Sequence, residues 1–190
     1  MNALIKGAAL AATLMVPTAF AADYVIDTKG AHASINFKVN HLGYSWVVGR
    51  FDRFDGQFNY DASKPEATQV TVNIDPASVN SNHAERDKHI RGSDFLDVSQ
   101  FKSAQFVSQR YEVVDETRGK LHGEFTLRGV TQPMVIEVTK IGEGQDPWGG
   151  YRVGFEGQAE IVMKEFGIPM DLGPQSATVQ LDLHVEGVKL

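Results

Sequence analysis

The sequence predicts an all-β fold, an antiparallel barrel of eight or nine strands with one short helix. Apolar and polar residues alternate with a period of two along most of the chain, which is typical of strands with one buried face. Glycine, proline, asparagine and aspartate gather between these segments, where turns are expected. A sheet with one apolar face must bury that face and protect its edges, and closure into a barrel achieves both.

The expected strands form two groups. Regular alternation marks six segments, at residues 33–39, 70–74, 121–127, 134–138, 153–163 and 179–185. Less regular strands are expected near Tyr24–Asp27, Arg50–Tyr60 and Ser103–Val114. Turn or bulge signals separate them, at Asp55-Gly56, residues 59–65, Arg118-Gly119, Arg128-Gly129 with Pro133, and residues 142–150.

One segment, Asn82–Gly92, breaks the alternation and predicts a short helix over residues 83–91. Asn82 suits the N-cap, and Glu85 three residues later completes a capping-box pattern. Gly92 suits the position that follows the last helical residue.

The first 21 residues have the pattern of a secretory signal peptide. Lys6 is the only charge between Asn2 and Ala22, an apolar run extends from Ala8 to Val16, and Ala19-Phe20-Ala21 has the form of a cleavage site. The run is too short to cross ~30 Å of hydrocarbon as a helix. We expect cleavage after Ala21, export to the periplasm, and one domain over residues 22–190.

Composition narrows the classes of function. The chain has no cysteine, so disulfides, thiolate nucleophiles and zinc–thiolate sites are excluded. Lys6 is one of 18 basic residues, so its removal would leave 17 basic against 24 acidic residues, a net charge of −7. Nucleic-acid contacts need clustered cations, so no nucleic-acid partner is expected.

The function depends on whether the barrel is filled or hollow, because eight strands can enclose either packed side chains or one small ligand. Small inward residues such as Gly123 and Gly157 leave space, or they admit a neighbouring side chain. If there is a cavity, its lining is apolar and favours a long hydrocarbon, since each buried CH₂ contributes ~0.8 kcal/mol. The candidate lining residues are Ile35, Phe37, Val39, Phe54, Phe58, Val72, Ile74, Phe106, Phe125, Leu127, Phe155, Ile161, Leu181 and Leu183.

Four motifs, in order along the chain, resemble the YceI-like family of periplasmic polyisoprenoid-binding proteins. They are HLGYSWVVGRF at residues 41–51, NHAERDKHIRGSDFL at 82–96, DPWGG at 146–150 and FGIPMDLGP at 166–174. The resemblance implies an eight-stranded lipocalin-like barrel with an elongated apolar pore. It also implies a bound isoprenoid lipid, such as a polyprenyl phosphate or a quinone tail, with no catalytic residue and no required cofactor.

The helix carries the densest group of ionisable residues. Arg86, Lys88 and Arg91 are three cations in an acidic chain, and near a barrel mouth they would contact a lipid headgroup. His83 with Asp87, and Glu85 with His89, have the i, i+4 spacing of metal-ligand or acid–base pairs. Intrahelical ion pairs on a solvated helix are the favoured interpretation, and no metal is expected.

The aromatic residues Tyr44 and Trp46 are interpreted as part of a loop between strands. The favoured prediction is that they cap the barrel as core, and the alternative is that they gate the pore or touch a membrane surface. Trp148, in DPWGG, is predicted to be a packed turn residue.

We therefore expect a periplasmic lipid carrier or reservoir, monomeric or homodimeric, with transient membrane contact as an option. An alternative is a secreted hydrolase or peptidase, since Ser45 and Ser93-Asp94 lie near histidines in the sequence, although there is no G-x-S-x-G motif. A third option is a filled barrel that acts as a stress-related interaction module.

Overall fold

The computed structural model describes residues 21–190. The predicted signal peptide lies outside the described residues, apart from its last one, and stays a prediction.

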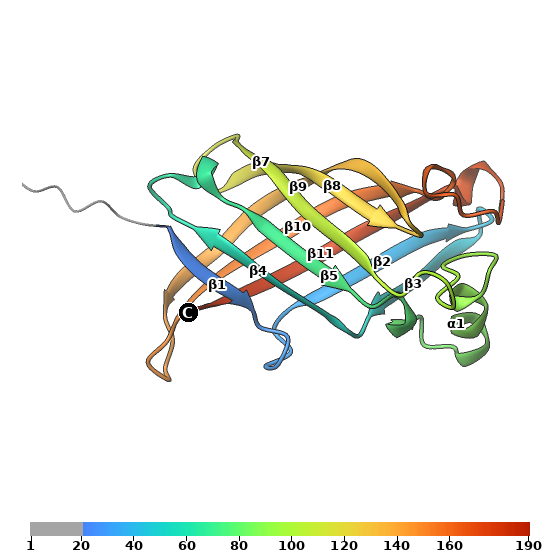
Figure 1. The fold of residues 1–190 in the computed structure, drawn as a ribbon, viewed down its shortest axis with the longest axis horizontal. Helices are drawn as coiled ribbons and strands as arrows, with labels where there is room; N and C mark the ends of the chain where they lie inside the picture. Colours follow the sequence, from blue (N-terminus) through green and yellow to red (C-terminus); the bar gives the residue numbers. More distant parts are fainter. Residues whose placement is uncertain (1–20) are drawn as a thin grey trace, which may run out of the picture.

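Eight antiparallel strands close into a barrel (Figure 1). Each strand pairs with the next around the ring, and β1 returns to pair with β11. The all-β barrel predicted from the alternation is therefore confirmed. In order around the ring the strands are β1 (Ala22–Ile26), β4 (Phe54–Tyr60), β5 (Val70–Ile74), β7 (Ala104–Val113), β8 (Arg118–Leu127), β9 (Val130–Gln145), β10 (Tyr151–Val162) and β11 (Thr178–Lys189).

Strand β11 has two partners on one side, which the alternation did not predict. Its C-terminal part pairs with β1, where Gly187 faces Ile26. Its N-terminal part pairs with β2 (Ser34–His41), where Val179 faces Val39. From β2 the sheet continues through β3 (Ser45–Phe51) to the two-residue β6 (Val79–Asn80).

Tyr44 and Trp46 were predicted to lie in a loop between strands, but only Tyr44 lies in the hairpin turn, and Trp46 belongs to β3. Val47 and Val48 are adjacent apolar residues, but they lie on opposite faces, so the apolar–polar alternation fails there. The predicted strand over 50–60 is in fact the end of β3 and the whole of β4. The predicted loop over 142–150 is also too long, because Gly142 and Gly144 still belong to β9 and pair with Gly154 and Arg152.

Helix α1 spans Ala84–Arg91, but its cap differs from the predicted one. The N-cap is His83, whose Nδ1 accepts a hydrogen bond from the Arg86 backbone N–H at 3.2 Å. Asn82 precedes the cap in a left-handed conformation with φ of 60°. Gly92 directly follows the last helical residue, as predicted; its φ is −73°, and its backbone N–H donates to the His89 carbonyl.

The two ends of the barrel differ (Figure 1). At one end, here called the helix end, lie α1, the β2–β3 hairpin tip and the 3₁₀ helices Met163–Phe166 and Pro174–Ser176. At the other, the tyrosine end, Tyr60 and Tyr111 lie near the ends of β4 and β7, beside the 3₁₀ helix Pro65–Ala67. The remaining 3₁₀ helix, Pro76–Ser78, connects β5 to β6.

Several inward glycines accommodate aromatic rings instead of leaving open space. A Cβ on Gly123 would lie 2.6 Å from Phe106 Cζ, and one on Gly187 would lie 2.3 Å from Phe58 Cζ. A Cβ on Gly119 would meet the Tyr111 ring at 2.2 Å. The inward glycines thus mostly admit neighbouring side chains, and the barrel interior still retains a void.

Candidate functional site

An apolar cavity of about 250 Å³ lies inside the barrel. It borders residues at both ends, from Tyr60 and Tyr111 at the tyrosine end to Ile90 and Ile168 at the helix end. All fourteen residues predicted from the sequence as candidate lining border it. Other residues in the same inward rows also border the cavity, although they were not predicted to do so. They include Ile26, Val70, Leu121, Met134, Ile136 and Val138.

The lining carries almost no polar chemistry. Beyond apolar side chains it includes the hydroxyl-bearing residues Tyr60, Thr68 and Tyr111, together with Glu156. Glu156 is exposed and alternates with inward Phe155 and Gly157, so its carboxylate faces solvent. The volume is close to the lower limit of typical small-molecule sites. The cavity is therefore suited to a slender hydrocarbon and not to a charged metabolite.

The three hydroxyl-bearing residues come from adjacent strand ends. Phe58 pairs with Val70, so continuing the antiparallel register places Thr68 opposite Tyr60. The Thr68 Oγ1 atom is buried and has no hydrogen-bond partner among the described residues. Burial raises the pKa of Tyr111 above its ordinary value, so its phenol remains protonated at neutral pH.

Packed aromatic residues, including Tyr60, occupy the tyrosine end. Tyr24 and Phe58 stack with their ring centroids 5.1 Å apart. The Phe155 ring meets Phe58 edge to face at 5.9 Å and Tyr60 at 5.3 Å. Val153, beside them, is fully buried.

A β-bulge places an ion pair on the inner face of the same end. Phe155 pairs with Lys140 and Val153 pairs with Glu143, because Ile141 is an extra residue in β9. Lys140 and Glu143 consequently share the inward face and form an ion pair. Burial lowers the pKa of Lys140, but the hydrogen bonds to Glu143 and Tyr60 and the charges of these two groups together outweigh it, so the net pKa is raised. The Lys140 Nζ lies 5.4 Å from the Tyr60 ring centroid.

The helix end closes the cavity with apolar residues. Ile90 from α1 borders the cavity, as do Phe95 and Leu96 from the segment after it. Asp87, which is buried, accepts hydrogen bonds from the Ser81 backbone N–H at 2.7 Å and from the Ser81 hydroxyl. These bonds attach α1 to β6.

The three predicted headgroup cations do not border the cavity. Arg86 donates from Nε to Ser81 Oγ at 2.7 Å and from Nη2 to the Ser81 carbonyl. Arg91 donates to the Val79 carbonyl at 3.3 Å, and Lys88 is exposed. Arg86 and Arg91 therefore have structural partners between α1 and β6.

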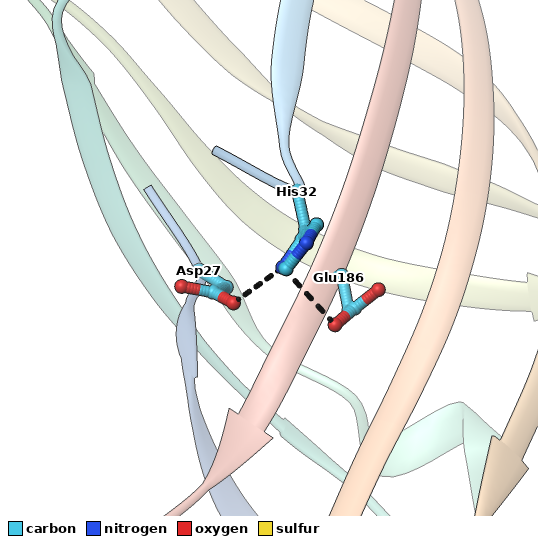
Figure 2. A group of neighbouring side chains, drawn as sticks. All are labelled: Asp27, His32 and Glu186. Carbon is cyan, nitrogen blue, oxygen red and sulfur yellow. Dashed lines mark hydrogen bonds and ion pairs between the residues drawn. The ribbon is translucent and has the colours of Figure 1, made fainter. Parts of the chain in front are cut away.

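An ionic cluster outside the barrel surrounds Arg152. Its Nη1 donates to Asp27 Oδ2 at 2.7 Å and to Glu186 Oε1, and its Nε donates to Asp146 Oδ2 at 2.9 Å. Figure 2 shows His32 between Asp27 and Glu186, with its Nδ1 2.9 Å from Asp27 Oδ2. These three residues are close enough together to hold a metal ion.

Arg152 already uses the oxygens that a metal would need. The only potential metal-binding group in residues 21–190 consists of Asp27, His32 and Glu186. Two of its oxygens, Asp27 Oδ2 and Glu186 Oε1, already accept hydrogen bonds from the Arg152 guanidinium. The hydrogen bonds from Arg152, His32 and the Gly30 N–H hold the pKa of Asp27 far below its ordinary value. The cluster connects the β1–β2 loop, the β9–β10 turn and β11 at the point where β11 changes partners.

Two predictions about aromatic side chains are wrong. Tyr44 is 86% exposed and Trp46 is 51% exposed, so the β2–β3 hairpin tip is not part of the core. Trp148 is 77% exposed, and its ring lies over the Arg152 guanidinium at 5.5 Å. In DPWGG the turn is held by Asp146, whose carboxylate accepts hydrogen bonds from the backbone N–H groups of Trp148 and Gly150.

The serine–histidine pairs suggested by the sequence do not form among the described residues. His89 lies 3.2 Å from Asp94 Oδ2, and its ring meets Phe95 edge to face. The other histidine–carboxylate contacts involve His32, His122 and His184. No hydrogen bond joins a histidine to a serine within residues 21–190.

No helix in the described part of the chain is both long enough and apolar enough to span a membrane.

Comparison with known proteins gives a consistent result. Residues 24–187 match the YceI-like domain. A UPF0312 protein of Shewanella denitrificans is 60% identical over 183 residues, which cover 95% of each chain. A second UPF0312 protein, from Shewanella sp. strain W3-18-1, is 58% identical over 192 residues and covers all of both chains.

Solved structures share the architecture. The YceI protein of Campylobacter jejuni is 26% identical with a TM-score of 0.73, covering 80% of this chain and 91% of that one. BcnA of Burkholderia cenocepacia has a TM-score of 0.74 at 20% identity, covering 85% and 98%. A polyisoprenoid-binding domain of Saccharophagus degradans, implicated in plant cell wall breakdown, has a TM-score of 0.65 at 15% identity, covering 90% and 100%. By its domain match and its sequence relatives, the chain belongs to the YceI-like family.

Proposed function

We propose that this protein is a periplasmic carrier or reservoir that binds a long-chain isoprenoid or similar lipid inside the barrel. The observation that carries the proposal is the interior cavity, whose lining is apolar almost throughout. Burial of a hydrocarbon contributes ~0.8 kcal/mol per CH₂, so the tail alone supplies a large driving force for binding. Ordering costs offset part of it. The description of the Saccharophagus degradans relative as polyisoprenoid-binding supports the ligand class.

Binding in this proposal needs no catalytic group. The cavity surface is apolar, and its lining residues include no nucleophile–base pair. The proposed role is therefore to shield a lipid tail from water, and the signal-like N-terminus supports a location in the periplasm.

The test is to block the cavity without changing the outer surface. Val138 borders the cavity, whereas Val135 on the same strand points outward and is 45% exposed. Purified wild-type protein, Val138→Trp and Val135→Trp are extracted with organic solvent, and the extracts are analysed by mass spectrometry. We expect a lipid in the wild type and in Val135→Trp, and much less in Val138→Trp.

Circular dichroism and urea unfolding verify that both tryptophan variants fold. Overpacking typically costs about 1–3 kcal/mol, which a stable barrel tolerates. Equal lipid content in the two folded variants, or no lipid in any of the three samples, would contradict binding inside the barrel.

A further inference from the structure

The tip of the β2–β3 hairpin presents apolar side chains to the outside of the barrel. Leu42, Tyr44, Trp46 and Val48, here called the tip patch, are all exposed and follow one another closely in the chain. Trp46 and Val48 alternate with the half-buried Val47, so both point outward from β3. Exposed apolar side chains that gather in one place mark a surface for contact with another protein or with a membrane.

The backbone of the turn makes a leucine at its first central position unusual. The Tyr44 backbone N–H donates to the His41 carbonyl at 2.9 Å. Between them, Leu42 has φ of 54° and Gly43 has φ of 84°, as in a type I′ hairpin turn. Asparagine, aspartate and glycine favour these positions, whereas Leu42 is disfavoured there by its left-handed backbone as well as by its exposure. An outlier of this kind indicates a function for the side chain.

The tip is fixed to the barrel by the segment that precedes β11. The Leu42 backbone N–H donates to Ser176 Oγ at 3.3 Å, and Ser176 is fully buried. The Gln175 side chain rests against the turn, because a Cβ on Gly43 would lie 2.0 Å from Gln175 Oε1. The apolar side chains are therefore held in place before any partner arrives, which lowers the entropic cost of binding.

The charge of the tip differs from that of the rest of the chain. Between Lys38 and Arg50 there is no aspartate or glutamate, although the chain has 24 acidic residues, and the adjacent segment 167–177 has Asp171 alone. Arg50 forms an ion pair with Asp52, whereas the Lys38 Nζ lies 5.1 Å from the Trp46 ring centroid. A cation beside exposed apolar rings is complementary to anionic headgroups above an apolar layer.

The tip lies at the end of the barrel where a separate element borders the cavity. Figure 1 places the β2–β3 tip at the same end as α1, and Ile90 of α1 borders the cavity there with Leu96. The opposite end is packed with aromatic rings and carries the Arg152 cluster. A bilayer in contact with the tip patch would therefore face the end of the barrel at which α1 meets the cavity.

We propose that the tip patch is a docking surface for the headgroup region of a membrane that contains anionic phospholipids. Tryptophan and tyrosine favour this region, because their rings are apolar and their polar groups stay hydrated. The contact is shallow, because residues 45–49 of β3 have no strand partner on their outer edge within the described part of the chain. Unpaired backbone groups do not enter hydrocarbon. The purpose of docking rests on the proposed function, to which it adds the surface where the lipid is collected or delivered.

The first experiment uses the two tryptophans of the chain as matched reporters. Trp46 belongs to the tip patch, whereas Trp148 is also exposed but lies in the β9–β10 turn at the opposite end. Delipidated mature protein with Trp148→Phe reports Trp46, and protein with Trp46→Phe reports Trp148. Each is mixed with vesicles of phosphatidylglycerol and phosphatidylethanolamine in equal parts, whose chains carry bromine either near the headgroup or near the chain end. We expect bromine near the headgroup to quench Trp46 more strongly than bromine near the chain end, and neither to quench Trp148.

Vesicle flotation measures what each side chain contributes. Tyr44→Ser combined with Trp46→Ser should weaken binding to these vesicles at least about tenfold, because two rings no longer leave water for the interface. Lys38→Gln should weaken it about fivefold and leave binding to phosphatidylcholine vesicles unchanged, as expected for one cation near an anionic surface. Trp148→Ser is the matched control and should bind like the wild type. Circular dichroism verifies that all the variants fold.

Three results would overturn the docking surface. The first is equal quenching of Trp148 and Trp46, and the second is wild-type vesicle binding by folded protein with Tyr44→Ser and Trp46→Ser. The third is a tip that joins two copies of the chain through the free edge of β3. In that case light scattering would show a wild-type dimer and a monomeric double variant, and neither would bind vesicles.

Solvent extraction separates this inference from the function on which its purpose rests. Wild-type protein that yields a lipid, but whose Trp46 is not quenched by vesicles, would keep the lipid-binding barrel and lose the docking surface. Wild-type protein that binds vesicles through the tip patch but yields no lipid would contradict the proposed function and leave the membrane contact in place.

Discussion

The tyrosine end and the helix end are built on the same strands but close the barrel by different means. At the tyrosine end, the packed rings of Tyr24, Phe58 and Phe155 fill the interior, and the Arg152 cluster fastens the outside. At the helix end, Ile90 and Leu96 border the cavity and come from α1 and the segment after it, which lie at this end of the barrel. The barrel therefore has one end held by its own strands and one end covered by a separate element.

This difference has a physical consequence for mobility. Strands of the closed ring can separate only by breaking their ladder hydrogen bonds, whereas α1 contacts the barrel mainly through β6 and a few side chains. Segments with few buried contacts open at a lower free-energy cost than core strands. We expect the helix end to open more readily than the tyrosine end.

The largest expected effect concerns the aromatic packing. Phe58→Ala should lower the free energy of unfolding by about 3–5 kcal/mol, because the ring is buried against Tyr24 and Phe155. Phe95→Ala, at the helix end, should cost distinctly less, because Phe95 is only partly buried. Urea unfolding of both variants measures the comparison. Equal losses would show that the two ends are packed equally tightly.

A smaller loss in the free energy of unfolding is expected for a substitution where α1 contacts β6. Asp87→Ala leaves the Ser81 backbone N–H without its acceptor, which should cost about 1–3 kcal/mol. Because the bond belongs to the helix end, amide hydrogen exchange should accelerate in α1 and remain unchanged in β10 and β11. Exchange that accelerates uniformly would contradict an independently opening helix end.

The sequence indicated the barrel strands well because one face of each is buried, and burial imposes the period of two. Prediction from the sequence failed where an interaction other than burial of one strand face determines where a side chain lies. Strand β3 carries apolar side chains on both faces, and Trp148 packs on a guanidinium instead of on the core. The predicted core roles of Tyr44, Trp46 and Trp148 all assumed that a large apolar side chain is buried, and all three are exposed.

The candidate site shows the same limit. The inward rows of the cavity follow from alternation, and Lys140 extends the row Met134, Ile136 and Val138, so the sequence contained that signal. Glu143 joins the same face only because of the bulge at Ile141, which alternation does not predict. The partnership of Arg86 with Ser81 likewise depends on the turn between β6 and α1.

The pH dependence of stability should reveal the ionic cluster that fastens the tyrosine end. Arg152, His32 and the Gly30 N–H lower the pKa of Asp27, so its ionised form stabilises the fold above the ordinary value of 3.8. That contribution is lost as the pH falls below 3.8 toward the lower pKa of the folded state. Asp27→Asn should therefore be less stable than the wild type at pH 7, and the difference should shrink by pH 3.

A matched control separates this cluster from an ordinary surface pair. Asp115 forms an exposed ion pair with Arg118, and that contact lowers its pKa to about 2. Solvent screens such a pair, so Asp115→Asn should change stability little at either pH. Urea unfolding at pH 7, 5 and 3 tests both variants, and a larger pH effect in Asp115→Asn would contradict the role given to Arg152.

The smallest effect is expected at the β2–β3 hairpin tip, which projects from the helix end. Tyr44 and Trp46 are exposed, so Tyr44→Ser and Trp46→Ser should change the free energy of unfolding by no more than about 0.5 kcal/mol. Trp46→Ser should lower the free energy of unfolding slightly more than Tyr44→Ser, because the Lys38 Nζ lies 5.1 Å from the Trp46 ring centroid. A loss above about 2 kcal/mol in either variant, measured by thermal and urea unfolding, would mean that the tip packs against the barrel and closes the helix end together with α1.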